Sequence, residues 1–71
     1  MDIRLIIRIH NLISNKKTGT PKQLSKTLEV SERTVYNYIA FMKQELNAPI
    51  IYNIALANYC YEFDCKLNFK G

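Results

Sequence analysis

Two helix-start signals lie close together between Thr20 and Leu46, and they constrain the fold more than any other feature of the chain. At the first, the Thr20 hydroxyl and the Gln23 side chain can form a capping box, with Pro21 at the first helical position. At the second, Ser31 is a good N-cap, and Glu32 places negative charge at the positive end of the helix dipole. The segment therefore predicts two helices joined by a short turn, over about 20–29 and 31–46.

The second of these helices has one apolar face and one polar face. Its apolar residues recur at the spacing of a single buried stripe: Val35, Ile39, Met42 and Leu46. At about 100° per residue, the opposite direction is held by Arg33, Asn37, Ala40 and Gln44. A helix that enters a DNA major groove needs such a free strip of hydrogen-bonding side chains, because its N-terminal residues reach the base edges.

The stretch PKQLSKTLEVSERTVYNYI resembles the helix-turn-helix of winged-helix bacterial transcription regulators of the DeoR-like type, whose pattern is roughly ELAxxLxVSxRTVxRxI. The matching positions are Leu24, Leu28, Val30, Ser31, Arg33, Thr34, Val35 and Ile39. Two positions depart from the pattern, since Ser25 stands where the family usually has alanine and Glu29 where the turn often has glycine. Two packed helices without a nucleic-acid function are the alternative, because paired short amphipathic helices are common in all-α proteins.

The resemblance implies a small α+β winged helix, in which a three-helix bundle precedes a two- or three-stranded antiparallel sheet. A first helix over about 2–15 fits this fold, because Asp2 can cap it. Its apolar residues share one arc of the helical wheel: Leu5, Ile6, Ile9, Leu12 and Ile13. Ile3 and Ile7 fall outside that arc, and we expect them to contact a partner chain, to contact the C-terminal strands or to stay partly exposed.

Beyond Leu46 the pattern changes from helix to strand. Asn47 can adopt the left-handed conformation that ends a helix, and Pro49 cannot continue one. Two β-rich segments then predict a hairpin with strands over about 50–53 and 58–63, and alternating residues predict a third strand over 65–70. The resemblance implies that four hairpin residues face the helices: Ile50, Tyr52, Tyr59 and Tyr61.

The hairpin tip differs from the wings of the family, many of which carry Arg or Lys there. Residues 53–58 read NIALAN, which is uncharged and lacks the usual glycine. We therefore expect this wing to add little to DNA affinity. Ile54 and Leu56 indicate a protein contact if they are exposed, and the alternative is that they fold back under the sheet.

Length and composition predict one domain over residues 1–71, with a core that is barely sufficient on its own. We therefore expect either a very compact fold or a homodimer, formed through Ile3, Ile7 or an exposed strand from Phe63 to Phe69. Residues 1–44 hold eight basic and three acidic side chains, whereas residues 45–71 hold two basic and three acidic ones. The positive charge thus lies on the helical half, as a phosphate-contacting surface requires, although a merely solvated surface would have the same composition.

The residue inventory disfavours several functions. Cys60 and Cys65 are the two cysteines and His10 is the single histidine, so we expect no metal site and read the cysteines as small apolar residues. No glycine-rich phosphate loop and no histidine–carboxylate pair stands out, so we expect no enzyme and no cofactor. Without a signal peptide or a run of apolar residues that could span a membrane, a cytoplasmic location and no membrane partner are expected.

The sequence favours a small transcription regulator that binds specific double-stranded DNA sites, with helix 31–46 in the major groove. Base reading is assigned to Arg33 and Asn37, with Thr34 beside them, because arginine pairs with guanine and asparagine with adenine. Phosphate contacts are assigned to residues near the helix starts: Lys16, Lys17, Thr20, Lys22, Lys26, Ser31 and Tyr36. One alternative is a protein-interaction winged helix without DNA binding, which the uncharged tip and Glu32 favour. The other is a DNA-binding accessory factor of a mobile element.

Overall fold

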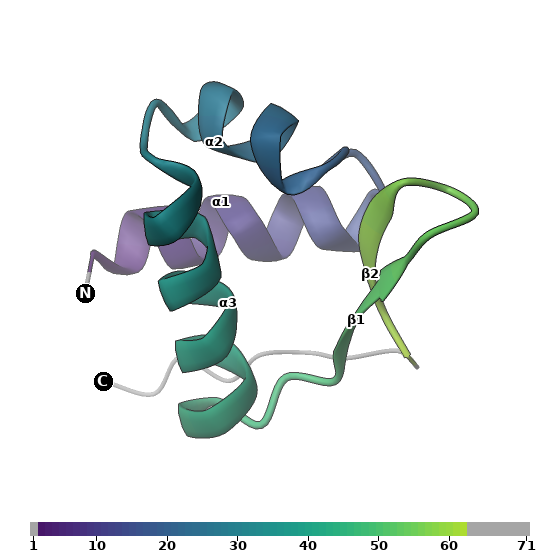
Figure 1. Ribbon diagram of the computed structural model, residues 1–71. Coiled ribbons are helices and arrows are strands. Elements are labelled where there is room, and N and C mark those ends of the chain that lie inside the picture. The colour runs from purple at the N-terminus through teal and green to yellow at the C-terminus, as the bar shows by residue number, and fades with distance from the viewer. Residues whose placement is uncertain (1, 63–71) are drawn as a thin grey trace.

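The computed structural model describes residues 2–62, and its fold is a small α+β winged helix (Figure 1). Three helices come first: α1 (Ile3–Ser14), α2 (Pro21–Leu28) and α3 (Glu32–Glu45). Two strands follow, β1 (Ile50–Asn53) and β2 (Asn58–Tyr61), and they pair antiparallel. The strand predicted over 65–70 and the association edge predicted from Phe63 to Phe69 lie outside the described residues.

The caps predicted at the helix starts are all present. The Asp2 carboxylate accepts a hydrogen bond from the Arg4 N–H at 2.9 Å. Thr20 accepts from the Gln23 N–H at 3.2 Å, and the Gln23 side chain accepts in return from the Thr20 N–H at 2.9 Å. Ser31 accepts from the Thr34 N–H at 3.1 Å. Each cap satisfies backbone donors that have no partner inside the helix, and this sets where α1, α2 and α3 begin.

Each helix is followed by a non-glycine residue in the left-handed region. These residues are Lys16 (φ 55°), Glu29 (φ 59°) and Asn47 (φ 52°). After α2, the Val30 N–H reaches back to the Ser25 carbonyl at 3.0 Å, which closes the helix in a Schellman motif. The left-handed conformation predicted for Asn47 is confirmed, and Glu29 adopts it where glycine is common. A non-glycine side chain in this region raises the free energy of the folded state by about 1–2 kcal/mol.

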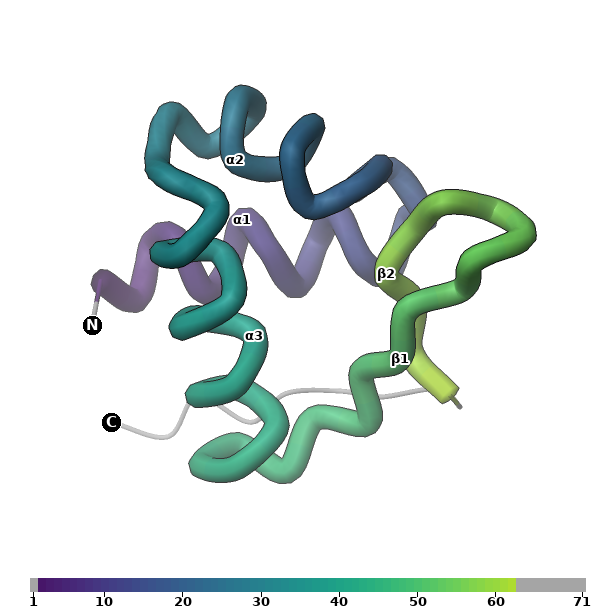
Figure 2. Tube along the Cα trace, viewed as in Figure 1, coloured from purple at the N-terminus to yellow at the C-terminus, as the bar shows by residue number. Residues whose placement is uncertain are grey.

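The apolar stripes of the three helices meet in one core, which the hairpin closes at one end (Figure 2). Its buried members are Ile6, Ile9 and Ile13 of α1, Leu24 and Leu28 of α2, Val35, Ile39 and Met42 of α3, and Ala48, Ile50 and Tyr59 beyond them. Leu5, Leu12 and Leu46 are half-buried at the edge of this core. Burial of each large aliphatic side chain stabilises the fold by about 1.5–3 kcal/mol, so the helix faces are fixed by this cluster.

The hairpin follows the predicted strands closely but not in every residue. Ile50 pairs with Tyr61 and Tyr52 pairs with Tyr59, so all four predicted residues share one face of the sheet. Ile50 and Tyr59 are buried and Tyr61 is half-buried, whereas Tyr52 is exposed at its end of the strand. The second strand ends at Tyr61 rather than at residue 63, and Glu62 lies in a bend. The core therefore covers the base of the hairpin and leaves the Tyr52 side chain open to solvent.

Two side chains fasten the hairpin to the α1–α2 loop. The Asn58 amide donates to the Lys16 carbonyl at 3.0 Å, and its Oδ1 accepts from the Gly19 N–H at 2.6 Å. The Thr18 hydroxyl accepts from the Tyr59 N–H at 2.8 Å, and the residue Thr18 is only 2% exposed. These bonds join segments about forty residues apart in the chain. They fix the orientation of the wing relative to the helices.

Candidate nucleic-acid interface

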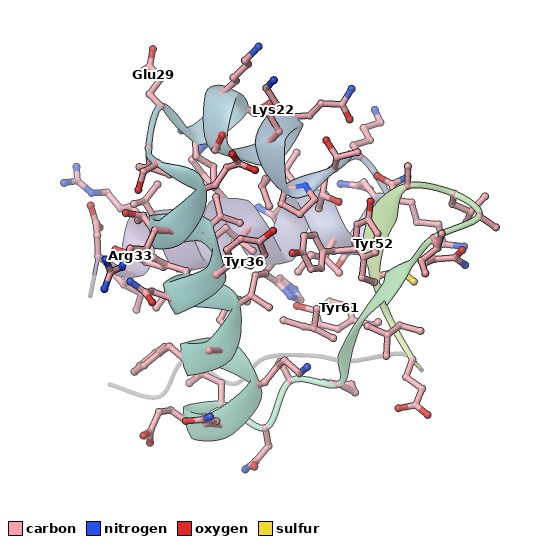
Figure 3. All side chains as sticks on the ribbon, viewed as in Figure 1. Lys22, Glu29, Arg33, Tyr36, Tyr52 and Tyr61 are labelled. Atoms are coloured by element: carbon pink, nitrogen blue, oxygen red, sulfur yellow. The ribbon has the colours of Figure 1, made fainter. Side chains whose placement is uncertain are left out.

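The structure leaves the outward face of α3 open to solvent. Val35, Ile39 and Met42 are buried in the core, which determines the rotation of the helix about its axis. The opposite face is exposed along the helix and carries Arg33, Asn37, Ala40 and Gln44. No hydrogen bond or ion pair within residues 2–62 engages the side chains of Arg33 and Asn37, so their donors and acceptors are available to a ligand. Figure 3 shows Arg33 pointing away from the first turns of α3.

The two hydroxyls at the start of α3 are already engaged. Ser31 is exposed, and its Oγ lies 3.0 Å from Thr34 Oγ1 as well as accepting from the Thr34 N–H. Thr34 is half-buried, unlike Arg33 and Asn37. The structure therefore makes Ser31 the N-cap, with Thr34 bonded to it, and places both residues at the N-terminal end of the exposed face. A hydroxyl that caps a helix keeps a lone pair or its proton for a further contact.

The predicted phosphate-contacting lysines lie on two neighbouring elements. Lys22 and Lys26 project from α2, and Lys16 and Lys17 belong to the loop that precedes it. All four side chains are exposed, and Lys22 extends into solvent in Figure 3. Within residues 2–62 the one ion pair joins Arg4 and Asp2, so these four ammonium groups are not neutralised by nearby carboxylates. The start of α2 adds backbone N–H groups and the positive end of its dipole, which favour anions.

Thr20 and Tyr36 have different surroundings from the lysines. Thr20 is half-buried, and its hydroxyl serves the capping box of α2. Tyr36 is 53% exposed and extends from α3 toward the hairpin, where Tyr52 lies on the same side of the molecule (Figure 3). The rings of Tyr52 and Tyr59 meet edge to face with centroids 5.0 Å apart. Burial raises the pKa of the Tyr59 phenol, and the nearby Tyr36 and Tyr52 phenols raise it further.

The hairpin tip has no charge and exposes its aliphatic side chains. Ile54 is 85% exposed and Leu56 is 56% exposed, so these residues do not fold back under the sheet. The tip is nevertheless ordered by the Asn53 side chain, which accepts from the Leu56 N–H at 3.1 Å. No Lys or Arg occurs from residue 47 to residue 61. A wing without cations cannot attract phosphate by charge.

Sequence reasoning missed two contacts that shape this region. One is the set of hydrogen bonds by which Thr18 and Asn58 hold the wing in place. The other joins His10, whose Nδ1 lies 2.6 Å from the Tyr61 hydroxyl. Burial lowers the pKa of His10. Both contacts join residues that are far apart in the chain, and no local pattern indicates them.

The model of the HTH domain family matches residues 4–53, which span α1, α2, α3 and β1. Neither the curated proteins nor the solved structures gave a match to this chain. None of the helices in the described part of the chain has the length and apolar composition to cross a membrane. Over the same residues, no group of three or more histidine, cysteine or acidic side chains is placed to hold a metal ion.

The match covers more than half of the chain and includes both helices of the helix-turn-helix. It also covers α1 and the first strand of the wing, and it does not distinguish the DeoR-like type. DNA binding and transcription regulation are the functions that such a domain indicates. The chain belongs to the HTH domain family, a family of DNA-binding domains.

Proposed function

We propose that this protein binds specific sites on double-stranded DNA, with α3 lying in the major groove, and that it regulates transcription from those sites. The observation that carries this proposal is the open polar face of α3, whose opposite face is locked into the core. A major groove about 12 Å wide admits one α-helix, and the residues of its first turns reach the base edges. Arg33 and Asn37 occupy those turns and are free to make such contacts.

Base reading falls to Arg33 and Asn37. The guanidinium of Arg33 can donate two parallel hydrogen bonds to guanine O6 and N7, and the Asn37 amide can pair with adenine N6 and N7. Thr34 lies beside them, where its methyl or hydroxyl can meet a base at the edge of the contact. Ala40 and Gln44 continue the same face toward the end of the helix, farther from the groove floor.

Phosphate contacts position the helix in the groove. Lys22 and Lys26 of α2, with Lys16 and Lys17 of the preceding loop, supply four exposed cations. Thr20, Ser31 and Tyr36 add hydroxyl groups near the same helix starts. If the four lysines each neutralise one phosphate, the plot of log K against log salt has a slope of about −3 to −4.

Selection of bound sites from a random duplex pool tests this function. We expect a preferred sequence to emerge, and we expect Arg33→Ala to lose ~1–3 kcal/mol of binding free energy and to relax the preference at one base pair. Lys43→Ala is the matched control, because it removes one exposed positive charge from the last turn of α3. If Arg33→Ala and Lys43→Ala select the same sites as the wild type with equal affinity, Arg33 does not read bases.

A protein partner is the second candidate, and the exposed aliphatic tip favours it. Ile54 and Leu56 present an apolar, ordered and uncharged surface that suits another protein better than a phosphate backbone. This contact is compatible with DNA binding through α3, since it uses a different part of the molecule. Complete absence of binding to random duplex DNA at low salt would leave the protein partner as the remaining function.

Dimerisation would let two copies read an inverted repeat. Ile3 is 53% exposed on α1, and Ile7 lies one turn further along the same helix, also exposed. Burying this pair between two copies would remove apolar surface from water, which favours association. Selected sites with two-fold symmetry, and weaker, non-cooperative binding of Ile3→Ser to such sites, are the expected results. Asymmetric sites bound by single copies would count against the dimer.

A further inference from the structure

The wing flanks α3 but supplies no cation, so any contact it makes with DNA must use neutral groups. Residues 47–61 contain no Lys or Arg, whereas three tyrosines lie on the two strands: Tyr52, Tyr59 and Tyr61. A tyrosine hydroxyl is a neutral donor at neutral pH and can hydrogen-bond to a phosphate oxygen. Asparagine amides and backbone N–H groups of the wing are other neutral donors, and the tyrosine hydroxyls are therefore one of the groups by which the wing can hydrogen-bond to the sugar–phosphate backbone.

The contacts of the hydroxyl groups separate structural tyrosines from available ones. Tyr38 accepts from the Asp2 N–H at 3.0 Å, and the Tyr61 hydroxyl meets His10 at 2.6 Å. The hydroxyls of Tyr36 and Tyr52 have no hydrogen-bond partner within residues 2–62. Both side chains are exposed and lie on the same side of the molecule, one from α3 and one from β1 (Figure 3). These two hydroxyls are thus free to bind a ligand that lies across α3 and the wing.

The position of Tyr52 is held by its neighbours rather than by its own hydroxyl. Its ring rests edge to face on the buried ring of Tyr59, with centroids 5.0 Å apart. Tyr59 is in turn anchored through its backbone N–H to Thr18 Oγ1 at 2.8 Å. The phenols of Tyr36 and Tyr52 are close enough to Tyr59 to raise its pKa. A ring fixed in this way directs its hydroxyl without a hydrogen bond inside the protein, and such preorganisation lowers the entropy lost on binding.

We propose that Tyr52 of the wing is a phosphate-contacting residue, acting with Tyr36 as a pair of neutral hydrogen-bond donors to the DNA backbone. This inference rests on the proposed placement of α3 in the major groove. The pair would bridge the helix and the hairpin and hold the wing against the strand that borders the groove. A wing of this kind adds affinity without sequence preference and without charge.

Salt dependence distinguishes this contact from the lysine contacts. A lysine that neutralises a phosphate releases a counterion, so its removal makes the slope of log K against log salt less steep by about 0.9. A neutral hydroxyl releases none, so its removal lowers log K by the same amount at every salt concentration. A base-reading residue differs from both, because its removal changes the preference among sequences.

The test measures the affinity of the full chain for its selected duplex and for a random duplex at several salt concentrations, by fluorescence anisotropy. Tyr52→Phe keeps the ring on Tyr59 and removes only the hydroxyl. We expect it to weaken binding to both duplexes by roughly three- to tenfold, with the slope of the wild type. Lys22→Ala is expected to make the slope less steep. Tyr38→Phe is the matched control on α3 and is expected to leave affinity unchanged, because its hydroxyl faces Asp2.

Three results would overturn the inference while leaving the proposed function in place. They are wild-type affinity of Tyr52→Phe at every salt concentration, a less steep slope for Tyr52→Phe, and a loss confined to the selected duplex. Loss of binding by Tyr38→Phe equal to that of Tyr52→Phe would also count against it, since both would then act through the fold. Failure of the wild type to bind any duplex would instead remove the proposed function itself.

Discussion

Asn58 is the residue whose loss should loosen the wing most. Its side chain accepts a hydrogen bond from the Gly19 N–H at 2.6 Å and donates one to the Lys16 carbonyl at 3.0 Å, both in the α1–α2 loop, and it also accepts a longer one from the Thr18 hydroxyl at 3.3 Å. The first is part-buried, so Asn58→Ala leaves a donor poorly solvated, at a cost of about 1.5 kcal/mol. The second is exposed, and water can replace the amide there, so its loss costs about 0.5 kcal/mol.

Together the two losses lower the free energy of unfolding by about 2 kcal/mol, which should lower Tm by roughly 8–16 °C for a domain of this size. Thermal and urea unfolding, followed by circular dichroism, measure the change. Asn53→Ala serves as an intermediate case, because within residues 2–62 the Asn53 side chain accepts a single hydrogen bond, from the Leu56 N–H of the tip. Asn37→Ala is the matched control, since its side chain is exposed on α3 and alanine is the better helix former.

We expect Asn37→Ala to be the most stable of the three variants, Asn53→Ala to be intermediate and Asn58→Ala to be the least stable. A fall in Tm of less than about 3 °C for Asn58→Ala would show that its hydrogen bonds contribute little, and that apolar contacts and the Thr18–Tyr59 bond hold the wing. That result would remove the basis for assigning the orientation of the wing to Asn58. It would also weaken the inference about Tyr52, whose ring rests on a strand that this contact orients.

Three further predictions concern the left-handed turn and the titrating side chains. Glu29→Gly should raise the free energy of unfolding by about 1 kcal/mol, because φ is 59° there, whereas Glu29→Ala should not; urea unfolding compares the two. Burial lowers the pKa of His10 below its ordinary 6.5, so the folded state binds fewer protons than the unfolded state. The free energy of unfolding should therefore fall as pH drops from 7 through the folded pKa, and His10→Gln should lose this dependence. Burial raises the pKa of Tyr59 above its ordinary 10.0, so stability should fall as pH rises beyond 10; the phenolate absorbance of wild type and Tyr59→Phe identifies the group.

The sequence was most informative where a feature depends on residues close together in the chain. Caps at Asp2, Thr20 and Ser31 act within three residues, and the stripe on α3 follows from helical spacing, so each could be predicted and each is confirmed. The left-handed conformation of Asn47 is also local. The open face of α3 follows from the stripe, because burial of one side of a helix determines which side stays exposed.

The features that could not be predicted join distant parts of the chain. Two such features are the hydrogen bond between Thr18 and Tyr59 and the one between His10 and Tyr61. Both depend on how the hairpin packs against α1 and the loop after it, which no local pattern specifies. The family resemblance implied that Tyr52 shares a face with Tyr59, but not how far the core extends beneath that face. The exposure of Tyr52, on which the inference about the wing rests, therefore required the three-dimensional arrangement.

The central claim is that the outward face of α3 meets the DNA, and an NMR titration tests it most directly. Amide shifts of the isotope-labelled protein would be followed as the selected duplex is added. We predict the largest shifts along the start of α2 and on α3 around Arg33, Asn37 and Ala40, with smaller shifts at Tyr52. Large shifts confined to Ile54, Leu56 or the exposed side of α1, with α3 unchanged, would contradict this account of how the protein binds DNA.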